Sequence, residues 1–402
     1  MGGVAIATKR RAIGLATITA LNAFAGLAPQ VSALLTMDAA AFGRFSLIYF
    51  AYALSLSLSL SLISEPWHIR LLAGRGAAWL PYASATAGLA LLSATAAVVL
   101  GLVLGFSLGL ALLAGLAIGL ATFWEPTRYF LLQHEQVRRA GLADVAYAMA
   151  FVSAGALGLA FTGDATFAVY LAWAAAGLAL LAFVPAPEGR FAWPWAWFRE
   201  HGREARRLAS DSILMDVGSV FTPIFLAPML GVAGFGTYRA VSNVAVPVRL
   251  ILNPLRPVIT NTRDAKWATG NRMWWGVVAG GVVVSLAVLL ALEALGWFGW
   301  QVGVLNSLLP FTVPVAVTVL ANFVGHYAYI RCRSRATTRE LLTGRVSQTL
   351  IVTLIPIAGV LIGGLPGGIW AYAISGVGTA IVWSLIDRRH AAPESPGALA
   401  AA

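Results

Sequence analysis

The residues best suited to binding chemistry lie in one apolar stretch, positions 238–262. It carries Arg249 and Arg256 together with Ser242 and Asn253. At about 100° per residue these four side chains fall on one face of a helix, so they form a polar stripe on an otherwise apolar segment. A charged side chain at the centre of a membrane costs about 2.5–3.5 kcal/mol on insertion scales, which makes such residues functional candidates. Because the donors of arginine form a fork that matches phosphate, the stripe predicts a site for an anion such as a diphosphate.

The arginines of this stretch differ in whether an acidic residue lies at the same depth. Counting the helical rise from the ends of the apolar segments, Asp216 is level with Arg256, so the two are predicted to form a structural ion pair. Arg239 lies near the outer end, level with Glu293. Both Arg256 and Arg239 are therefore either structural or substrate-binding. Arg249 has no acidic residue at its depth in the C-terminal half, which makes it the strongest candidate for a substrate contact.

The polar groups predicted inside the membrane in the N-terminal half are neutral. Asn22 and Gln30, on the first apolar segment, join the substrate-binding candidates. Ser57, Ser61 and Ser64 share one face of the second apolar segment, and serines at this spacing more often serve close helix packing than substrate binding. The deep charge predicted for the substrate pathway is therefore basic.

Motifs for catalysis or metal binding are nearly absent. The single Cys332 excludes a multi-thiolate metal site, and the five histidines show no zinc spacing. Residues 105–109 match the spacing of a nucleophile elbow but lack its strand–turn–helix context. No P-loop occurs. We therefore predict no enzymatic activity, no catalytic residue, and no cofactor or metal.

The elements that must hold these residues are apolar helices. Of the 402 residues, 59% are hydrophobic and 11% are charged, whereas soluble proteins average roughly 45–50% and about 25%. Apolar blocks of about twenty residues, separated by short basic clusters, predict an all-α integral membrane protein with about twelve transmembrane helices. The run from Ala77 to Trp124 has no charge and is too long for one crossing, so it is predicted to turn near Gly101 to Gly105.

The positive charge of the chain is unevenly distributed. The formal net charge is +11, with 27 Lys and Arg against 16 Asp and Glu. Most of the basic residues fall on the N-terminus and on every second connection, which places both termini in the cytoplasm. The charge therefore indicates topology in the cell inner (plasma) membrane, and we expect no nucleic acid as a partner.

A weak internal repeat divides the chain into two halves. The sequence Ala-Phe-Gly-Arg-Phe at 41–45 recurs as Gly-Phe-Gly-Thr-Tyr at 234–238. Each copy lies at the same place in a six-helix unit, so the halves are predicted to have parallel topology. The predicted parts are an N-terminal six-helix half, a cytoplasmic interfacial connection, a C-terminal six-helix half and a disordered tail. Their bounds are 1–184, 185–211, 212–389 and 390–402.

The twelve spans, the two parallel six-helix halves and the Phe-Gly-x-Phe/Tyr signature resemble the polysaccharide flippases of the multidrug/oligosaccharidyl-lipid/polysaccharide (MOP) exporter superfamily. The resemblance covers nearly the whole chain. It implies alternating access that moves a lipid-linked oligosaccharide or polysaccharide precursor, carried on polyprenyl diphosphate, from the cytoplasmic to the outer leaflet. It also implies contact with membrane lipids and with glycan polymerases or glycosyltransferases as partners.

Two other functions stay open at this stage. The first is a cation-coupled multidrug exporter of the same superfamily, which commonly relies on membrane carboxylates. No acidic residue lies between Ala12 and Leu35, which disfavours this alternative. The second is a non-transporting membrane component of polysaccharide assembly.

Overall fold

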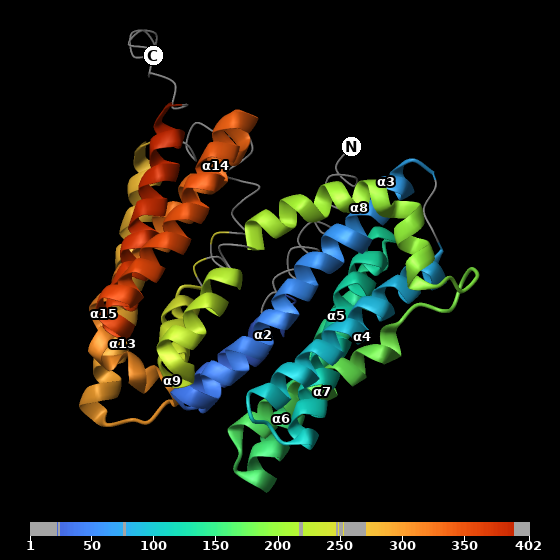
Figure 1. The fold of residues 1–402 in the computed structure, drawn as a ribbon, viewed down its shortest axis with the longest axis horizontal. Helices are drawn as coiled ribbons and strands as arrows, with labels where there is room; N and C mark the ends of the chain where they lie inside the picture. Colours follow the sequence, from blue (N-terminus) through green and yellow to red (C-terminus); the bar gives the residue numbers. More distant parts are fainter. Residues whose placement is uncertain are drawn as a thin grey trace, which may run out of the picture. The chain divides into compact units, whose positions relative to one another are not determined.

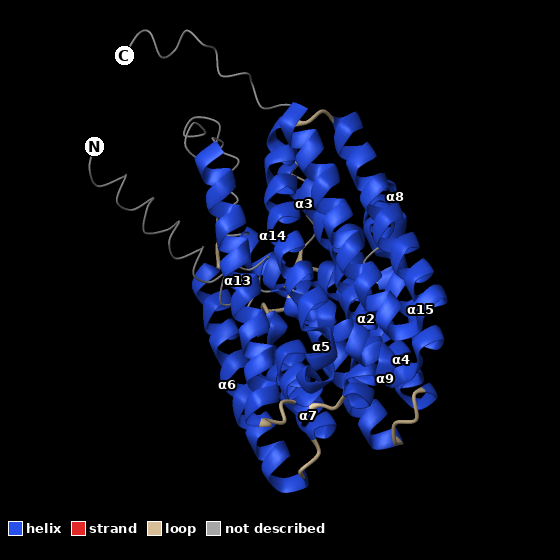
Figure 2. Ribbon diagram, turned by 90° about the vertical axis from the view of Figure 1, so that its left-hand side faces the viewer, coloured by secondary structure: helices blue, strands red, loops and turns tan. Residues whose placement is uncertain are grey.

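The structure is a computed structural model that describes residues 22, 25–74, 78–216, 220–246, 248, 252 and 271–389. Within these ranges all the regular elements are helices, joined by short loops (Figure 2). Nine helices of the described ranges are long and apolar enough to cross a membrane. The predicted all-α, multi-pass membrane architecture is therefore confirmed. The cytoplasmic placement of the termini stays a prediction.

The helices follow one another along the chain as labelled in Figure 1. Residues 25–36 are helical, and α2 continues through a π-helical turn into α3 as one long candidate span. The first group of elements is α2 (Ala39–Ser59), η1 (Leu60–Ser64), α3 (Glu65–Leu72), α4 (Trp79–Val103), α5 (Leu108–Gln133), α6 (Val137–Thr162), α7 (Ala165–Leu180) and η2 (Leu181–Phe183). The second group is α8 (Pro194–Asp216), α9 (Thr222–Val244), α13 (Asn271–Phe298), η4 (Gly303–Phe311), α14 (Thr312–Arg335) and α15 (Thr338–Arg389).

The charge-free run turns where the sequence predicts. Helix α4 ends at Val103, and Gly105 adopts a positive φ of 81°, a backbone conformation that favours glycine. Ser107 then caps α5 by accepting a hydrogen bond from the Leu110 N–H. The two helices pack closely, because a Cβ added to Gly119 would lie 3.0 Å from the Cβ of Ala94.

The described helices pack as two compact units. Unit 1 contains the described residues up to Gly236 together with Val302–Val304, and unit 2 contains those of 237–301 and those from Leu305 onward. Helix α8 and the first part of α9 therefore pack with the N-terminal helices. The predicted halves, 1–184 and 212–389, describe a repeat rather than a packing boundary, and they stay a prediction.

The repeated motif has a packing role within unit 1. A Cβ on Gly43 would collide with the carbonyl oxygen of Val232, and a Cβ on Gly236 would collide with that of Ala39. The two glycines also approach each other, since the same added Cβ on Gly236 would lie 2.9 Å from the Gly43 nitrogen. Phe42, Phe45 and Phe235 of the two copies are buried in unit 1, whereas Tyr238 is buried in unit 2, with its ring centroid 5.4 Å from that of Tyr372. The motif therefore lets the backbones of α2 and α9 meet directly.

Helix α8 packs against η1 and α3. The Trp197 indole, which is 2% exposed, donates from Nε1 to the Leu62 carbonyl at 3.3 Å. His201 stacks on Trp197 with ring centroids 3.8 Å apart, and Arg70 Nη1 lies 2.8 Å from Glu200 Oε1. Burial, together with the positive charge of Arg70, lowers the pKa of His201 below its usual value. The connection predicted as interfacial thus contains a docked helix.

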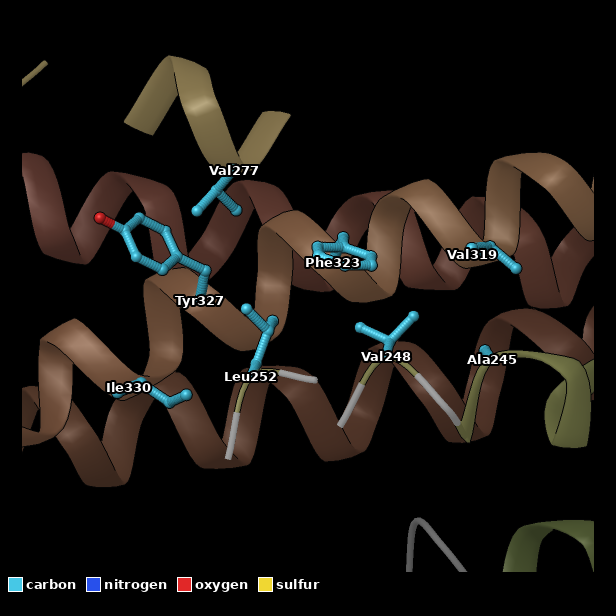
Figure 3. Close-up of a cluster of buried hydrophobic side chains, with 8 residues drawn as sticks. All are labelled: Ala245, Val248, Leu252, Val277, Val319, Phe323, Tyr327 and Ile330. Carbon is cyan, nitrogen blue, oxygen red and sulfur yellow. The ribbon is translucent and has the colours of Figure 1, made fainter. Parts of the chain in front are cut away.

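Unit 2 contains a hairpin within α15. The helix departs from helical geometry at Gly363 and Gly364, and its two arms pack together, because a Cβ on Gly359 would lie 2.5 Å from the Gly367 carbonyl oxygen. The arms correspond to the last two predicted spans. Val248 and Leu252 pack into an apolar cluster with residues of α13 and α14 (Figure 3). The members of this cluster are Ala245, Val248, Leu252, Val277, Val319, Phe323, Tyr327 and Ile330.

Candidate functional site

Unit 1 contains a small, partly open space between its helices, which we call the carboxylate cavity. Its volume is about 20 Å³, enough for one water-sized particle. Two carboxylates and four aromatic rings contribute to its wall. The lining residues are Asn22, Ala25, Gly26, Tyr52, Ala121, Trp124, Glu125, Asp144, Tyr147, Trp173 and Leu180.

One of the two carboxylates is held by a buried arginine. Arg128 of α5 lies 3.1 Å from Asp144 Oδ1 through Nε and 3.0 Å from Oδ2 through Nη2. The two residues are 7% and 2% exposed. Parallel donation to both carboxylate oxygens is the geometry in which arginine binds a carboxylate most strongly. The pair therefore joins α5 to α6 and neutralises both charges inside the apolar helix bundle.

The other carboxylate is available to the cavity. Glu125 precedes Arg128 by one helical turn, so both side chains project from the same face of α5. Among the described residues, Glu125 makes no hydrogen bond and no ion pair, whereas Asp144 takes the Arg128 fork. With two carboxylates and one guanidinium ionised, the group carries a net negative charge. It is suited to hold a proton or a small cation.

The aromatic wall adds to this preference for a cation. Tyr52 lies edge-on to Trp173, with ring centroids 5.2 Å apart, and Tyr49 packs against both rings. Aromatic faces attract cations through their quadrupole, most strongly where water is excluded. Within the described ranges, no group of three His, Cys, Asp or Glu side chains is placed to hold a metal ion. The cavity thus combines one available carboxylate with apolar, cation-tolerant walls.

The expectation that the intramembrane polar groups of the N-terminal half are neutral is wrong. Glu125, Arg128 and Asp144 all lie inside candidate spans, α5 and α6. Arg128 lies near the end of an apolar segment, where an arginine usually indicates topology. The sequence signal for this site is the spacing of three charged residues. Glu125 and Arg128 lie one helical turn apart near the end of one apolar segment, and Asp144 lies near the start of the next.

The predicted substrate-binding residues fall in different places. Asn22 lines the carboxylate cavity, and Gln30 is 8% exposed on the helix of residues 25–36. In unit 2, Arg239 Nη1 donates to the Ser242 hydroxyl at 2.8 Å, which brings two of the predicted substrate-binding residues together, one of them a member of the stripe. The other stripe members, Arg249, Asn253 and Arg256, lie outside the described residues, and their roles stay predictions.

The predicted ion pair of Asp216 with Arg256 also stays a prediction, because Arg256 lies outside the described residues. Asp216 ends α8 and is 8% exposed. Its carboxylate interacts with Ser57 of α2, and its Oδ2 atom is buried without a hydrogen-bond partner among the described residues. Ser61 and Ser64 are also buried, and the Ser64 hydroxyl lies 2.9 Å from that of Tyr82. The serine face of the second span thus serves helix packing, as predicted.

The fold is that of known membrane transporters. The chain is similar to an inward-facing multidrug resistance MATE family transporter of the MOP superfamily, with a TM-score of 0.60 and 14% identity, over 92% of this chain and 94% of that one. It is also similar to the lipid II flippase MurJ in an inward closed conformation, with a TM-score of 0.64 and 11% identity, over 92% of this chain and 87% of that one.

A third similar structure is a MOP superfamily transporter from Pyrococcus furiosus, described as having a binding pocket of reverse polarity that suggests a different function. Its TM-score is 0.52 and its identity 13%, over 94% of this chain and 93% of that one. No protein-family model and no curated protein matches the sequence. At these identities the similarity shows the fold. The chain has the fold shared by MATE exporters and the lipid II flippase, as its resemblance to the MOP superfamily implies.

Proposed function

We propose that the protein is a transporter of the inner (plasma) membrane that moves a lipid-linked oligosaccharide or polysaccharide precursor from the cytoplasmic to the outer leaflet by alternating access. The fold supports a transporter rather than an enzyme, since the similar structures are exporters and a flippase. The fold does not distinguish a cationic drug from an anionic lipid-linked glycan as the substrate. The charge along the substrate pathway is what distinguishes them.

The observation that carries the proposal is the basic stripe of positions 238–262. Its described member, Ser242, accepts a hydrogen bond from Arg239, a basic residue of the same segment that lies outside the stripe. The described residues Val248 and Leu252 pack on α13 and α14 (Figure 3). Arg249 has no acidic residue at its predicted depth in the C-terminal half, which makes it the strongest candidate for a substrate contact. A guanidinium there is the best ligand in the chain for a diphosphate.

The carboxylate cavity supplies the coupling step in this proposal. Binding of a proton or a small cation at Glu125 neutralises the surplus charge of unit 1, so occupancy of the cavity stabilises one conformation over another. Arg128 keeps Asp144 engaged, which leaves Glu125 as the group that responds to the ion. The substrate and the coupling ion thus use different units, and glycan polymerases or glycosyltransferases are the partners expected on either side of transport.

The second candidate is a cation-coupled multidrug exporter. Glu125 between Trp124 and Trp173 favours it, because a carboxylate among aromatic rings binds organic cations. The absence of acidic residues on the first span no longer argues against this function, since α5 provides one. The cavity volume of about 20 Å³ suits an ion rather than a substrate of either kind, so we place the flippase first on the basic stripe of positions 238–262.

A reconstituted transport assay separates the two functions. Proteoliposomes containing a fluorescent lipid-linked oligosaccharide should show protein-dependent movement between leaflets, whereas a cationic dye should not be transported. Glu125→Gln should fold normally and lose its response to an imposed proton or sodium gradient. Transport of the dye without movement of the lipid would reject the flippase.

Arg249 gives the mutational test of the same proposal. Arg249→Ala should abolish flipping while the protein still inserts and folds, because the main diphosphate ligand is lost. Arg249→Lys should restore it only partly, since lysine keeps the charge without the fork. Arg388→Ala, an exposed arginine near the end of α15, is the control and should transport normally. Full activity of Arg249→Ala would contradict the assignment.

A further inference from the structure

A second basic site is built where α14 ends and α15 begins, in unit 2. We call it the Tyr329 cluster, and it consists of Tyr329 and Arg333 on α14 with Arg345, Gln348 and Trp383 on α15. The Arg345 guanidinium lies 4.9 Å from the centre of the Tyr329 ring, and that of Arg333 lies 6.0 Å from it. Two positive charges thus share one aromatic ring.

The Arg345 guanidinium is fixed by its neighbours. It donates from Nη2 to the Tyr329 hydroxyl at 2.7 Å and from Nη1 to Gln348 Oε1 at 3.5 Å. The same Gln348 oxygen accepts a hydrogen bond from Trp383 Nε1 at 3.1 Å, and Trp383 is 1% exposed. These contacts use only part of the five-donor fork and hold the remainder in a set direction. The site is therefore preorganised for an acceptor.

The carboxylates nearby are engaged elsewhere. Asp387 lies 3.1 Å from Arg331 Nε, and Glu340 accepts from the Thr337 hydroxyl and N–H at the start of α15. No ion pair is formed with Arg333 or Arg345 anywhere in the described ranges. The Tyr329 cluster thus carries surplus positive charge, half-buried for Arg345 and exposed for Arg333. Its remaining donors are suited to an anion.

The surroundings of the cluster indicate which kind of anion it binds. Next to Arg345, the first arm of α15 presents an exposed apolar face, with Leu342, Val346 and Leu350 being 56%, 42% and 52% exposed. In a chain that spans a membrane, such a face is covered by lipid tails. An anion beside lipid tails, at the end of a span, is the phosphate of an amphipathic lipid.

We propose that the Tyr329 cluster binds the phosphate of a lipid, with Arg345 as the principal ligand and Arg333 as the second. Two lipids carry this chemistry, an anionic phospholipid of the bilayer and the polyprenyl diphosphate of a lipid-linked cargo. Only the second source rests on the proposed function. Binding of a phospholipid at the cluster does not depend on which substrate the transporter moves.

Native mass spectrometry of the full-length protein in detergent tests the proposal with three probes. These are phosphatidylglycerol, farnesyl diphosphate as a short polyprenyl diphosphate, and phosphatidylcholine as the zwitterionic control. The wild-type protein should retain at least one of the two anionic probes in preference to phosphatidylcholine. Retention of phosphatidylglycerol alone identifies a bilayer lipid, and displacement of it by farnesyl diphosphate identifies the cargo. Equal retention of all three would overturn the proposal.

Matched variants locate the site. Arg345→Gln should weaken binding of the retained anionic probe about tenfold, as expected for loss of one charge-assisted contact. Arg333→Gln, at an exposed position that folding does not depend on, should weaken it about threefold. Arg339→Gln, one helical turn or more from the cluster, should change it less than twofold. A structural role for Arg345 predicts instead a lower melting temperature with unchanged lipid affinity, and that result, or equal weakening by Arg339→Gln, would contradict the assignment.

Discussion

Within the described ranges, each compact unit buries an arginine–aspartate pair, and the two pairs lie in opposite electrostatic surroundings. In unit 1, Arg128 makes two parallel contacts with Asp144, and the third ionisable group beside them is the carboxylate of Glu125. In unit 2, Arg331 Nε lies 3.1 Å from Asp387 Oδ1, and both side chains are 5% exposed. The ionisable groups around this second pair include a further arginine, Arg335.

The difference shows how one fold separates two kinds of ligand. The charges of a paired arginine and aspartate cancel. The neighbouring unpaired group therefore sets the sign of the local charge beside each pair. Unit 1 has a surplus carboxylate in a cavity of ion size, which suits a proton or a small cation. Unit 2 has surplus guanidinium groups at the Tyr329 cluster and, by prediction, along positions 238–262, which suits phosphate. The proposed coupling ion and substrate therefore do not compete for the same groups.

Removing the acid of the unit 1 pair should have the largest effect on stability. Asp144→Asn leaves Arg128 charged and buried without its partner, which costs about 3–5 kcal/mol. Folded yield and melting temperature should both fall, and Asp144→Asn combined with Arg128→Met should recover much of the loss. The control is Glu200→Gln at the exposed ion pair with Arg70, where about 1 kcal/mol or less is expected. Equal effects at Asp144 and Glu200 would mean that the buried pair is not structural.

The close approach at the boundary of unit 1 should give the next largest effect. Gly236→Ala places a Cβ against the Ala39 carbonyl oxygen, and overpacking of this kind costs about 1–3 kcal/mol. Gly280→Ala in α13 is the matched control, because a Cβ there meets no atom within 4 Å. Melting temperatures of the two variants provide the measurement. A Gly236→Ala protein as stable as Gly280→Ala would show that α2 and α9 do not pack as described.

The docking of α8 should give the smallest effect, and one that depends on pH. The pKa of His201 is lowered in the folded protein, so the unfolded chain binds the proton first and stability is lost as pH falls below about 6.5. His201→Phe keeps a ring on Trp197 and should remove this loss. Melting temperatures measured from pH 8 to pH 5 compare the two proteins. An identical pH dependence in both would exclude His201 as its source.

The sequence predicted the features that depend on local pattern. Apolar blocks and the long charge-free run predicted the helical architecture and the turn near Gly101 to Gly105, because span length and glycine conformation are local properties. Asn22 was among the candidate site residues and lines the cavity. The close backbone contact behind the repeated glycine motif was not predicted, because it joins α2 to α9, which are distant in sequence.

The acidic half of the candidate site was missed for a physical reason. Arg128 and Asp144 are 16 positions apart on different helices, and their charges cancel only because α5 and α6 meet. From the sequence alone, an arginine near the end of a span is interpreted as a topology signal, because its partner on another helix is not visible. Once Arg128 is recognised as the partner of Asp144, Glu125 stands out as the surplus charge.

The most direct test of the division of charge is the reactivity of single cysteines toward thiol reagents of opposite charge. In a Cys332→Ser background, cysteines at Ser242 and Asn253 should react faster with an anionic than with a cationic methanethiosulfonate, because the stripe of positions 238–262 is basic. A cysteine at Leu252, which is 2% exposed in the apolar cluster, should react slowly with both. Faster reaction of the stripe with the cationic reagent, or equal labelling at all three positions, would contradict an anionic substrate and favour the multidrug exporter.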